Sequence, residues 1–165
     1  MPSKPHSKRL LLTLSAVTAL SVMFLNLQIT FLQFSSTDFQ CVSRLQTFEL
    51  QWIHSVEKEL WQETYQVTEQ ELLLTTTQFK TFGAGTPSNA DFIASTDGWL
   101  HYKIERLLPR MHWVVSRNVE STVITEFGTW PLYKDFDDYT EIQIQVIQVP
   151  LWHYFTQESC DDYFK

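Results

Sequence analysis

Glycine and proline are scarce in this chain, and most of the first half lacks them. The 165 residues include four glycines and six prolines, none of them between Ser7 and Phe82. Because these residues mark most turns, their absence predicts a long uninterrupted element. Large apolar side chains recur there every three or four residues, at Phe39, Val42, Leu45, Phe48, Trp52, Val56 and Leu60. This spacing is typical of the packing face of a helix, so we expect one helix over about residues 10–62, either continuous or broken near residues 35–38.

Charge is missing from residues 10–37, a run of 28 residues. About 20 helical residues cross a bilayer, and the bases Lys4, Lys8 and Arg9 precede this run. We therefore predict a basic cytoplasmic segment at 1–9, a transmembrane helix or signal anchor at 10–36, and an extracytoplasmic domain at 37–165. The protein is then a single-pass protein of the cell membrane, with its N-terminus in the cytoplasm and its C-terminal domain outside.

A cleaved signal peptide is the alternative to this anchor. Such a peptide needs a site of the form small-x-small after its apolar region. Val17-Thr18-Ala19 has this form but lies within the apolar run, and Phe34-Ser35-Ser36 places a bulky residue where a small one is needed. The sequence favours the uncleaved anchor.

An excess of positive charge is absent as well. All 19 acidic residues follow Thr37, together with nine of the 12 lysines and arginines, so this part carries a net charge of −10. Nucleic-acid-binding proteins usually present a basic stripe, so direct nucleic-acid binding is not expected. We interpret the acidic excess as a solvated surface.

Motifs of catalysis and of cofactor binding are missing. There is no H-E-x-x-H, no G-x-G-x-x-G and no G-x-S-x-G, so we predict no enzyme activity, no catalytic residue and no cofactor. The acidic run at 134–141 has oxygen ligands of the kind that calcium prefers but no glycine for the loop, so an acidic surface turn is favoured over a metal site. The histidines are interpreted as packed or surface residues. The bases Lys103, Arg106, Arg110 and Arg117 either bind an anion or face solvent.

Only two cysteines are present, Cys41 and Cys160. Outside the cytoplasm such thiols can stay oxidised, so a disulfide between them is the favoured expectation, and two unpaired thiols are the alternative. A bridge would join the two ends of the extracytoplasmic domain. On chain entropy alone it would contribute about 4–5 kcal/mol to stability.

Strand patterns follow the predicted helix. Residues 67–82 are rich in β-forming side chains, 83–89 read as a loop, and 99–108, 113–115 and 119–127 are strand candidates. Residues 142–146 alternate apolar and polar side chains, the clearest strand pattern in the chain. We expect an α+β fold: a long N-terminal helix, transmembrane and then amphipathic, packed on an antiparallel β-sheet.

This layout resembles that of type IV pilins and pseudopilins, and most of all the minor pilin of the Gram-positive competence pilus, the ComGF-like proteins. Phe48–Leu60 is similar to the end of the family's helix, with Val56-Glu57-Lys58-Glu59-Leu60 as the best match, and Tyr65–Leu74 resembles the family's next strand. The family's F-T-L-x-E motif is absent, because Leu11 stands in the place of its small residue and Ala16 in the place of its glutamate. The chain is then either an atypical minor subunit or similar in architecture alone.

The resemblance implies a non-enzymatic, membrane-held minor pilin-like subunit of a competence or type IV pilus system that supports DNA uptake. Its partners would be other pilin-like subunits and the membrane, without direct nucleic-acid contact. The alternative is a membrane-anchored or secreted extracytoplasmic ligand-binding domain of unrelated role.

Overall fold

A computed structural model describes residues 5–165, with side chains from residue 12 onward. The chain divides into two compact units. One consists of the chain up to Ile29 and Gln148–Gln157, and the other of Thr30–Ile147 and Glu158–Lys165. The side chains of Lys4, Lys8 and Arg9, which carry the predicted cytoplasmic segment, lie outside the described residues.

The smaller unit contains helix α1 (Pro5–Leu25) and the 3-10 helix η1 (Leu151–Thr156). Helix α1 ends where the side-chain amide of Asn26 donates a hydrogen bond of 2.7 Å to the carbonyl of Val22. The N–H of Leu151 donates to the carbonyl of Leu27 over 2.8 Å, which ties η1 to the end of this helix. Asn26 competes for the backbone groups that would continue the helix, so the segment after Leu25 leaves the helical conformation.

No helix in the described part of the chain combines the length and the apolar character needed to cross a membrane. The prediction of a transmembrane helix or signal anchor at residues 10–36 is therefore wrong. So is the single-pass localisation in the cell membrane, with a cytoplasmic N-terminus and the C-terminal domain outside, that was derived from it.

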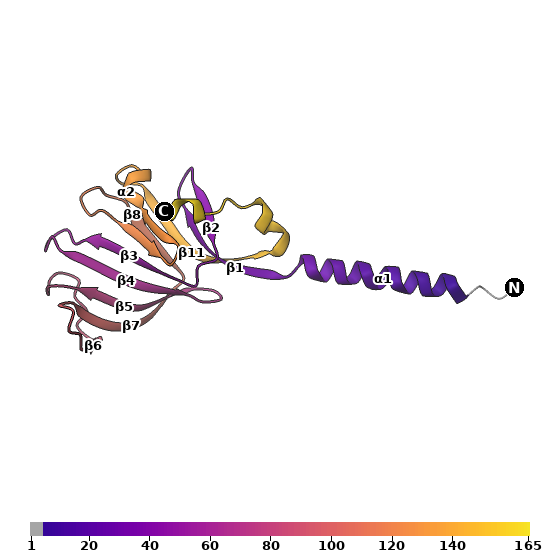
Figure 1. The fold of residues 1–165 in the computed structure, drawn as a ribbon, viewed down its shortest axis with the longest axis horizontal. Coiled ribbons are helices and arrows are strands. Elements are labelled where there is room, and N and C mark those ends of the chain that lie inside the picture. Colours follow the sequence, from indigo (N-terminus) through magenta and orange to yellow (C-terminus); the bar gives the residue numbers. More distant parts are fainter. Residues whose placement is uncertain (1–4) are drawn as a thin grey trace. The chain divides into compact units, whose positions relative to one another are not determined.

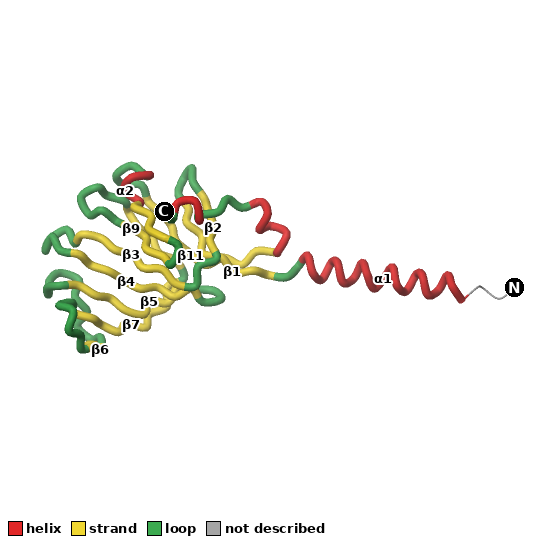
Figure 2. The backbone as a smooth tube through the Cα atoms, in the orientation of Figure 1, coloured by secondary structure: helices red, strands yellow, loops and turns green. Residues whose placement is uncertain are grey.

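Two antiparallel sheets make up most of the larger unit (Figures 1 and 2). The first has the strand order β2-β1-β11-β8 and is built from β1 (Gln28–Ser35), β2 (Gln40–Ser43), β8 (Arg110–Val114) and β11 (Glu141–Pro150). The second has the order β10-β9-β3-β4-β5-β7-β6 and is built from β3 (Thr47–Ile53), β4 (Leu60–Val67), β5 (Leu72–Phe79), β6 (Asp91–Ile93), β7 (Leu100–Leu108), β9 (Thr122–Thr125) and β10 (Gly128–Pro131). Two short helices, α2 (Leu132–Asp135) and η2 (Asp161–Tyr163), complete the unit.

The hydrophobic core of this unit draws side chains from both sheets. Phe34 of β1 and Ile144 of β11 belong to the same buried cluster as Leu50 of β3 and Val123 of β9. Trp130 of β10 is fully buried and lies edge-on to Phe34, with ring centroids 5.4 Å apart. The fold is thus held by apolar burial between sheets, the arrangement of a β-sandwich.

The predicted α+β fold, with a long N-terminal helix on an antiparallel sheet, is wrong. The residues of the expected helical stripe lie on strands and in turns: Phe39 before β2, Val42 on β2, Leu45 before β3, Phe48 and Trp52 on β3, Val56 in the following turn and Leu60 at the start of β4. Phe48, Leu50 and Trp52 also alternate with polar residues, which is the period of a strand. In β3 this period prevails, because antiparallel pairing with β4 places Phe48 opposite Tyr65 and Trp52 opposite Trp61.

The turns between these first strands form without glycine or proline. Lys58 adopts a left-handed backbone conformation, with φ of 57°, in the turn between β3 and β4. That turn is closed by a hydrogen bond of 2.8 Å from the N–H of His54 to the carbonyl of Glu59. Thr68 shapes the turn between β4 and β5, where its hydroxyl donates to the carbonyl of Glu71 over 2.7 Å. The lack of glycine and proline in this part of the chain therefore does not exclude turns.

The later strand predictions are largely confirmed. Strands β5, β7, β9 and β11 occupy segments that the sequence marks as strands, and Ile142 and Ile144 of β11 point into the core. Residues 128–131 form strand β10, which pairs with β9.

The predicted disulfide between Cys41 and Cys160 is present. Their Cα atoms lie 5.1 Å apart, within the usual range for a bridge. The adjoining backbones also pair, because the N–H of Val42 donates to Glu158 and the N–H of Cys160 donates to Val42, each over 2.9 Å. The C-terminal segment thereby covers the outer edge of β2, which would otherwise present unpaired backbone groups.

Candidate functional site

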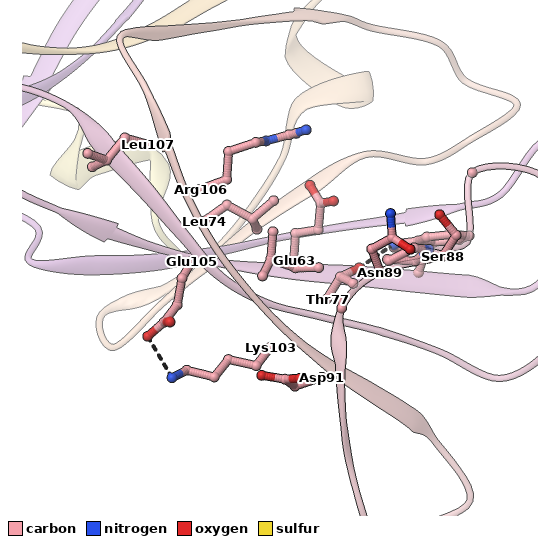
Figure 3. Close-up of a pocket in the computed structure, with 15 residues that line it drawn as sticks. Glu63, Leu74, Thr77, Ser88, Asn89, Asp91, Lys103, Glu105, Arg106 and Leu107 are labelled. Carbon is pink, nitrogen blue, oxygen red and sulfur yellow. Dashed lines mark hydrogen bonds and ion pairs between the residues drawn. The ribbon is translucent and has the colours of Figure 1, made fainter.

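A groove of about 750 Å³ opens on the seven-stranded sheet (Figure 3). Its floor is formed by Trp61 and Glu63 of β4 and by Leu74 and Thr77 of β5. Its rim is formed by Gly85, by residues 87–91 before and at the start of β6, and by residues 103–107 of β7. The volume lies within the range of small-molecule sites, and the lining mixes apolar and charged groups as such sites do.

The floor is set by the strand register. Glu63 lies opposite Thr77, and Trp61 lies opposite Phe79, so alternate residues of β4 and β5 share one face. The indole N–H of Trp61 donates a buried hydrogen bond of 2.7 Å to the hydroxyl of Thr77. Because this bond satisfies a polar group that would otherwise be buried alone, it holds the Trp61 ring in place.

Glu63 is the most unusual group of the floor. The hydroxyl of Tyr65, two residues further along the same face, donates a hydrogen bond to Oε2 of its carboxylate. Burial raises the pKa of Glu63 above its ordinary value of 4.5, and the bond from Tyr65 and the positive charge of Arg106 only partly offset this. Burial, followed by the nearby charge of Glu63, also raises the pKa of the Tyr65 hydroxyl, which therefore remains a donor.

A bulge in β7 shapes the opposite wall. Leu74 pairs with Arg106 and Thr76 pairs with Lys103, so two residues of β7 face the single residue Thr75. One of the two, Glu105, takes a left-handed conformation with φ of 53°. Bulges of this kind redirect side chains next to binding sites. Here the bulge brings Arg106 to the rim and lets Lys103 form an ion pair of 2.7 Å with Glu105 (Figure 3).

The loop at the other rim is fastened to the turn after β3. The N–H of Ala84 donates to Oε1 of Glu57 over 3.1 Å, and this carboxylate also contacts the ring of His54. Partial burial acts to raise the pKa of Glu57, but the N–H of Ala84 and the neighbouring His54 outweigh it and lower the pKa. Gly83 permits the close approach, because a Cβ atom there would lie 1.8 Å from Oε1 of Glu57.

The other residues marked by the sequence do not gather into a site. Within the described residues, no three His, Cys, Asp or Glu side chains are placed to hold a metal ion. In the acidic run, Asp138 pairs with Arg117 over 3.1 Å, and Asp135 accepts a hydrogen bond of 2.7 Å from the indole of Trp130. His101 pairs with Asp97, and His112 with Glu141. Of the basic cluster, Lys103 and Arg106 line the groove, and Arg110 and Arg117 are exposed outside its lining.

Trp61, Glu63 and Tyr65 were not predicted as site residues. Trp61 was placed at the end of the expected helix, Glu63 was given no role, and Tyr65 was placed at the start of the strand that the resemblance implies. A signal for them is present: Trp61, Glu63, Tyr65 and Val67 alternate with polar residues. A glutamate at an inward position of a strand is unusual, and it marks a candidate site once the strand is recognised.

These features define a class: an antiparallel two-sheet β domain with one disulfide and an open groove on its larger sheet. Within that class, the chain belongs to the family described as Domain of unknown function (DUF1850), which matches residues 48–132, just over half of the chain. The match runs from β3 to the first residue of α2 and includes every residue that lines the groove. No curated protein and no solved structure matches the chain.

Proposed function

We propose that this protein is a ligand-binding domain that takes up a small organic molecule in the groove between β4, β5 and β7. The observation that carries the proposal is the partly buried carboxylate of Glu63 on the groove floor, whose pKa is raised by burial. A buried carboxylate that is only partly compensated costs stability, and groups with a perturbed pKa gather at functional sites, so the position of Glu63 in an open groove favours recognition of a ligand.

The Cys41–Cys160 disulfide belongs to the unit that carries the groove, and such a bond persists under oxidising conditions. The absence of enzyme activity remains a prediction. A pilin-like role in DNA uptake is untested, and the long helix on which the resemblance rested is replaced by strands after residue 27.

The test is a thermal-shift screen of small metabolites against the disulfide-bonded protein. Ser88 is exposed on the groove rim, so Ser88→Trp narrows the groove. Asn118 is exposed outside the groove lining, and Asn118→Trp is the matched control for the added indole. Compounds that bind in the groove should raise the Tm of the parent and of Asn118→Trp but not of Ser88→Trp. The proposal fails when no compound raises the Tm, or when Ser88→Trp responds like its control.

A further inference from the structure

The charges that line the groove are of two kinds. Lys103 and Glu105 neutralise each other in an ion pair at the rim. Asp91 lies on the same side and acts electrostatically on Lys103. Glu63 and Arg106 are different, because they influence each other electrostatically without approaching to ion-pair distance within the described residues. Besides the Lys103–Glu105 ion pair, the groove thus holds the acids Glu63 and Asp91 and the base Arg106 (Figure 3).

Arg106 suits a carboxylate. Arg106 is exposed, and it lies opposite Leu74 in the strand register. A guanidinium presents a planar fork of donors that matches the two oxygens of a carboxylate, and such bidentate pairs are among the stronger hydrogen bonds of proteins.

Glu63 suits an ammonium group. The hydroxyl of Tyr65 occupies Oε2, which leaves Oε1 as an acceptor. Arg106 and the bond from Tyr65 compensate the burial of this carboxylate only in part. A bound cation would add compensating charge, and its N–H groups would donate to Oε1.

Apolar side chains also line the groove. Trp61 and Leu74 lie on the floor, and Ile104 and Leu107 lie on the β7 side. A ligand that fits this arrangement carries a positive and a negative end together with an aliphatic or aromatic side chain, because each part then meets a surface of matching character.

We infer that the groove binds a small zwitterion of the α-amino acid class, with its carboxylate on Arg106, its ammonium group on Glu63 and its side chain against Trp61 and Leu74. This inference rests on the proposed binding function and specifies its ligand.

The test compares leucine with two analogues that each lack one charge. Isoamylamine keeps the ammonium group and the side chain, and 4-methylpentanoate keeps the carboxylate and the side chain. Calorimetric titration of the full disulfide-bonded chain should show leucine binding at least about tenfold more tightly than either analogue, since a lost charge-assisted bond costs at least about 1.4 kcal/mol.

Variants then assign each charge to its partner. Arg106→Gln should bind leucine about tenfold more weakly and remove its advantage over isoamylamine, and Glu63→Gln should remove its advantage over 4-methylpentanoate. Arg110→Gln, an exposed base outside the groove lining, should leave all three affinities unchanged. Equal binding of leucine and either analogue, or unchanged leucine binding in both groove variants, would overturn the inference.

The outcomes separate this inference from the proposed function. One outcome is that leucine, glycine and phenylalanine all fail to bind while a compound from the thermal-shift screen binds the parent but not Ser88→Trp. That result overturns the ligand class and keeps the binding function. Absence of any groove ligand overturns both.

Discussion

Tyr65 and Glu63 lie two residues apart on one face of β4, and the hydroxyl of Tyr65 donates a hydrogen bond to the carboxylate of Glu63. The same tyrosine ring stacks on Phe48 of β3, with centroids 5.1 Å apart. Packing of the Tyr65 ring in the core therefore fixes the position of its hydroxyl next to Glu63. The hydrogen bond between the two residues links the core to the candidate site.

The raised pKa of Glu63 predicts a pH dependence of stability. The folded protein keeps the proton of this carboxyl group to a higher pH than the unfolded chain does, where the ordinary value is 4.5. As the pH rises above about that ordinary value, the folded state loses stability relative to the unfolded state. Below it, both states are protonated and this contribution is constant.

The measurement is the Tm difference between the parent protein and Glu63→Gln from about pH 4 to pH 8. Taking the difference removes the contributions of other acids, such as Glu57 and Asp138, whose pKa values are lowered. The parent should become progressively less stable than Glu63→Gln as the pH rises. A difference that is flat, or that grows in favour of the parent, would contradict the burial of Glu63.

Removal of the disulfide should cost about 4–5 kcal/mol of unfolding free energy on chain entropy, because the bond joins residues 119 positions apart. We expect this loss for Cys41→Ala/Cys160→Ala, and for the parent protein under reducing conditions, in urea unfolding. Adding reductant to the double variant is the control and should change nothing. An unchanged unfolding midpoint in the double variant would show that the bond does not constrain the unfolded chain.

Two tryptophans provide a test of the core. Trp130 is fully buried, and its ring stacks on Tyr163 with centroids 4.8 Å apart. Trp52 is partly exposed and packs at the edge of the core. Trp130→Ala should cost about 3–5 kcal/mol in urea unfolding, and Trp52→Ala should cost clearly less. Equal costs, or the reverse order, would place the centre of the core elsewhere.

Glu57 attaches the groove loop to the turn after β3, so substitutions of Gly83 and Glu57 should have coupled effects on the free energy of unfolding. Gly83→Ala should push the Glu57 carboxylate away and weaken its bond to the N–H of Ala84. In a Glu57→Ala background the obstruction is gone, so Gly83→Ala should then cost little. The expected coupling free energy is about 0.5–3 kcal/mol in a double-mutant cycle of urea unfolding. Additive costs would mean that Gly83 and Glu57 act independently.

Several features of this protein follow from local patterns in its sequence. The alternation of Ile142 and Ile144 with glutamines predicted strand β11, because a period of two places one set of side chains on one face. The number and positions of the cysteines predicted their pairing, since only one intramolecular bridge is possible with two thiols.

The conformation of the segment from β1 to β4 depends instead on contacts between residues distant in the chain. Phe48 and Trp52 are four residues apart, a spacing that fits one face of a helix as well as one face of a strand. Pairing with Tyr65 and Trp61 of β4 stabilises the strand conformation. Lys58 adopts the left-handed conformation of the turn, which the lack of glycine and proline did not lead us to expect. Local spacing is ambiguous here, because the free energy that selects between the two periods comes from residues distant in the chain.

The candidate site was decided in the same way. Glu63 and Arg106 are far apart in the sequence and belong to no motif, so neither marks a site alone. The antiparallel pairing of β4, β5 and β7 brings them to one groove, and the bulge opposite Thr75 places Arg106 beside Leu74. The position of Arg106 relative to Glu63 depends on the register of both strand pairs between them, β4 with β5 and β5 with β7. The sequence alone does not give these registers, so the groove could not be predicted from it.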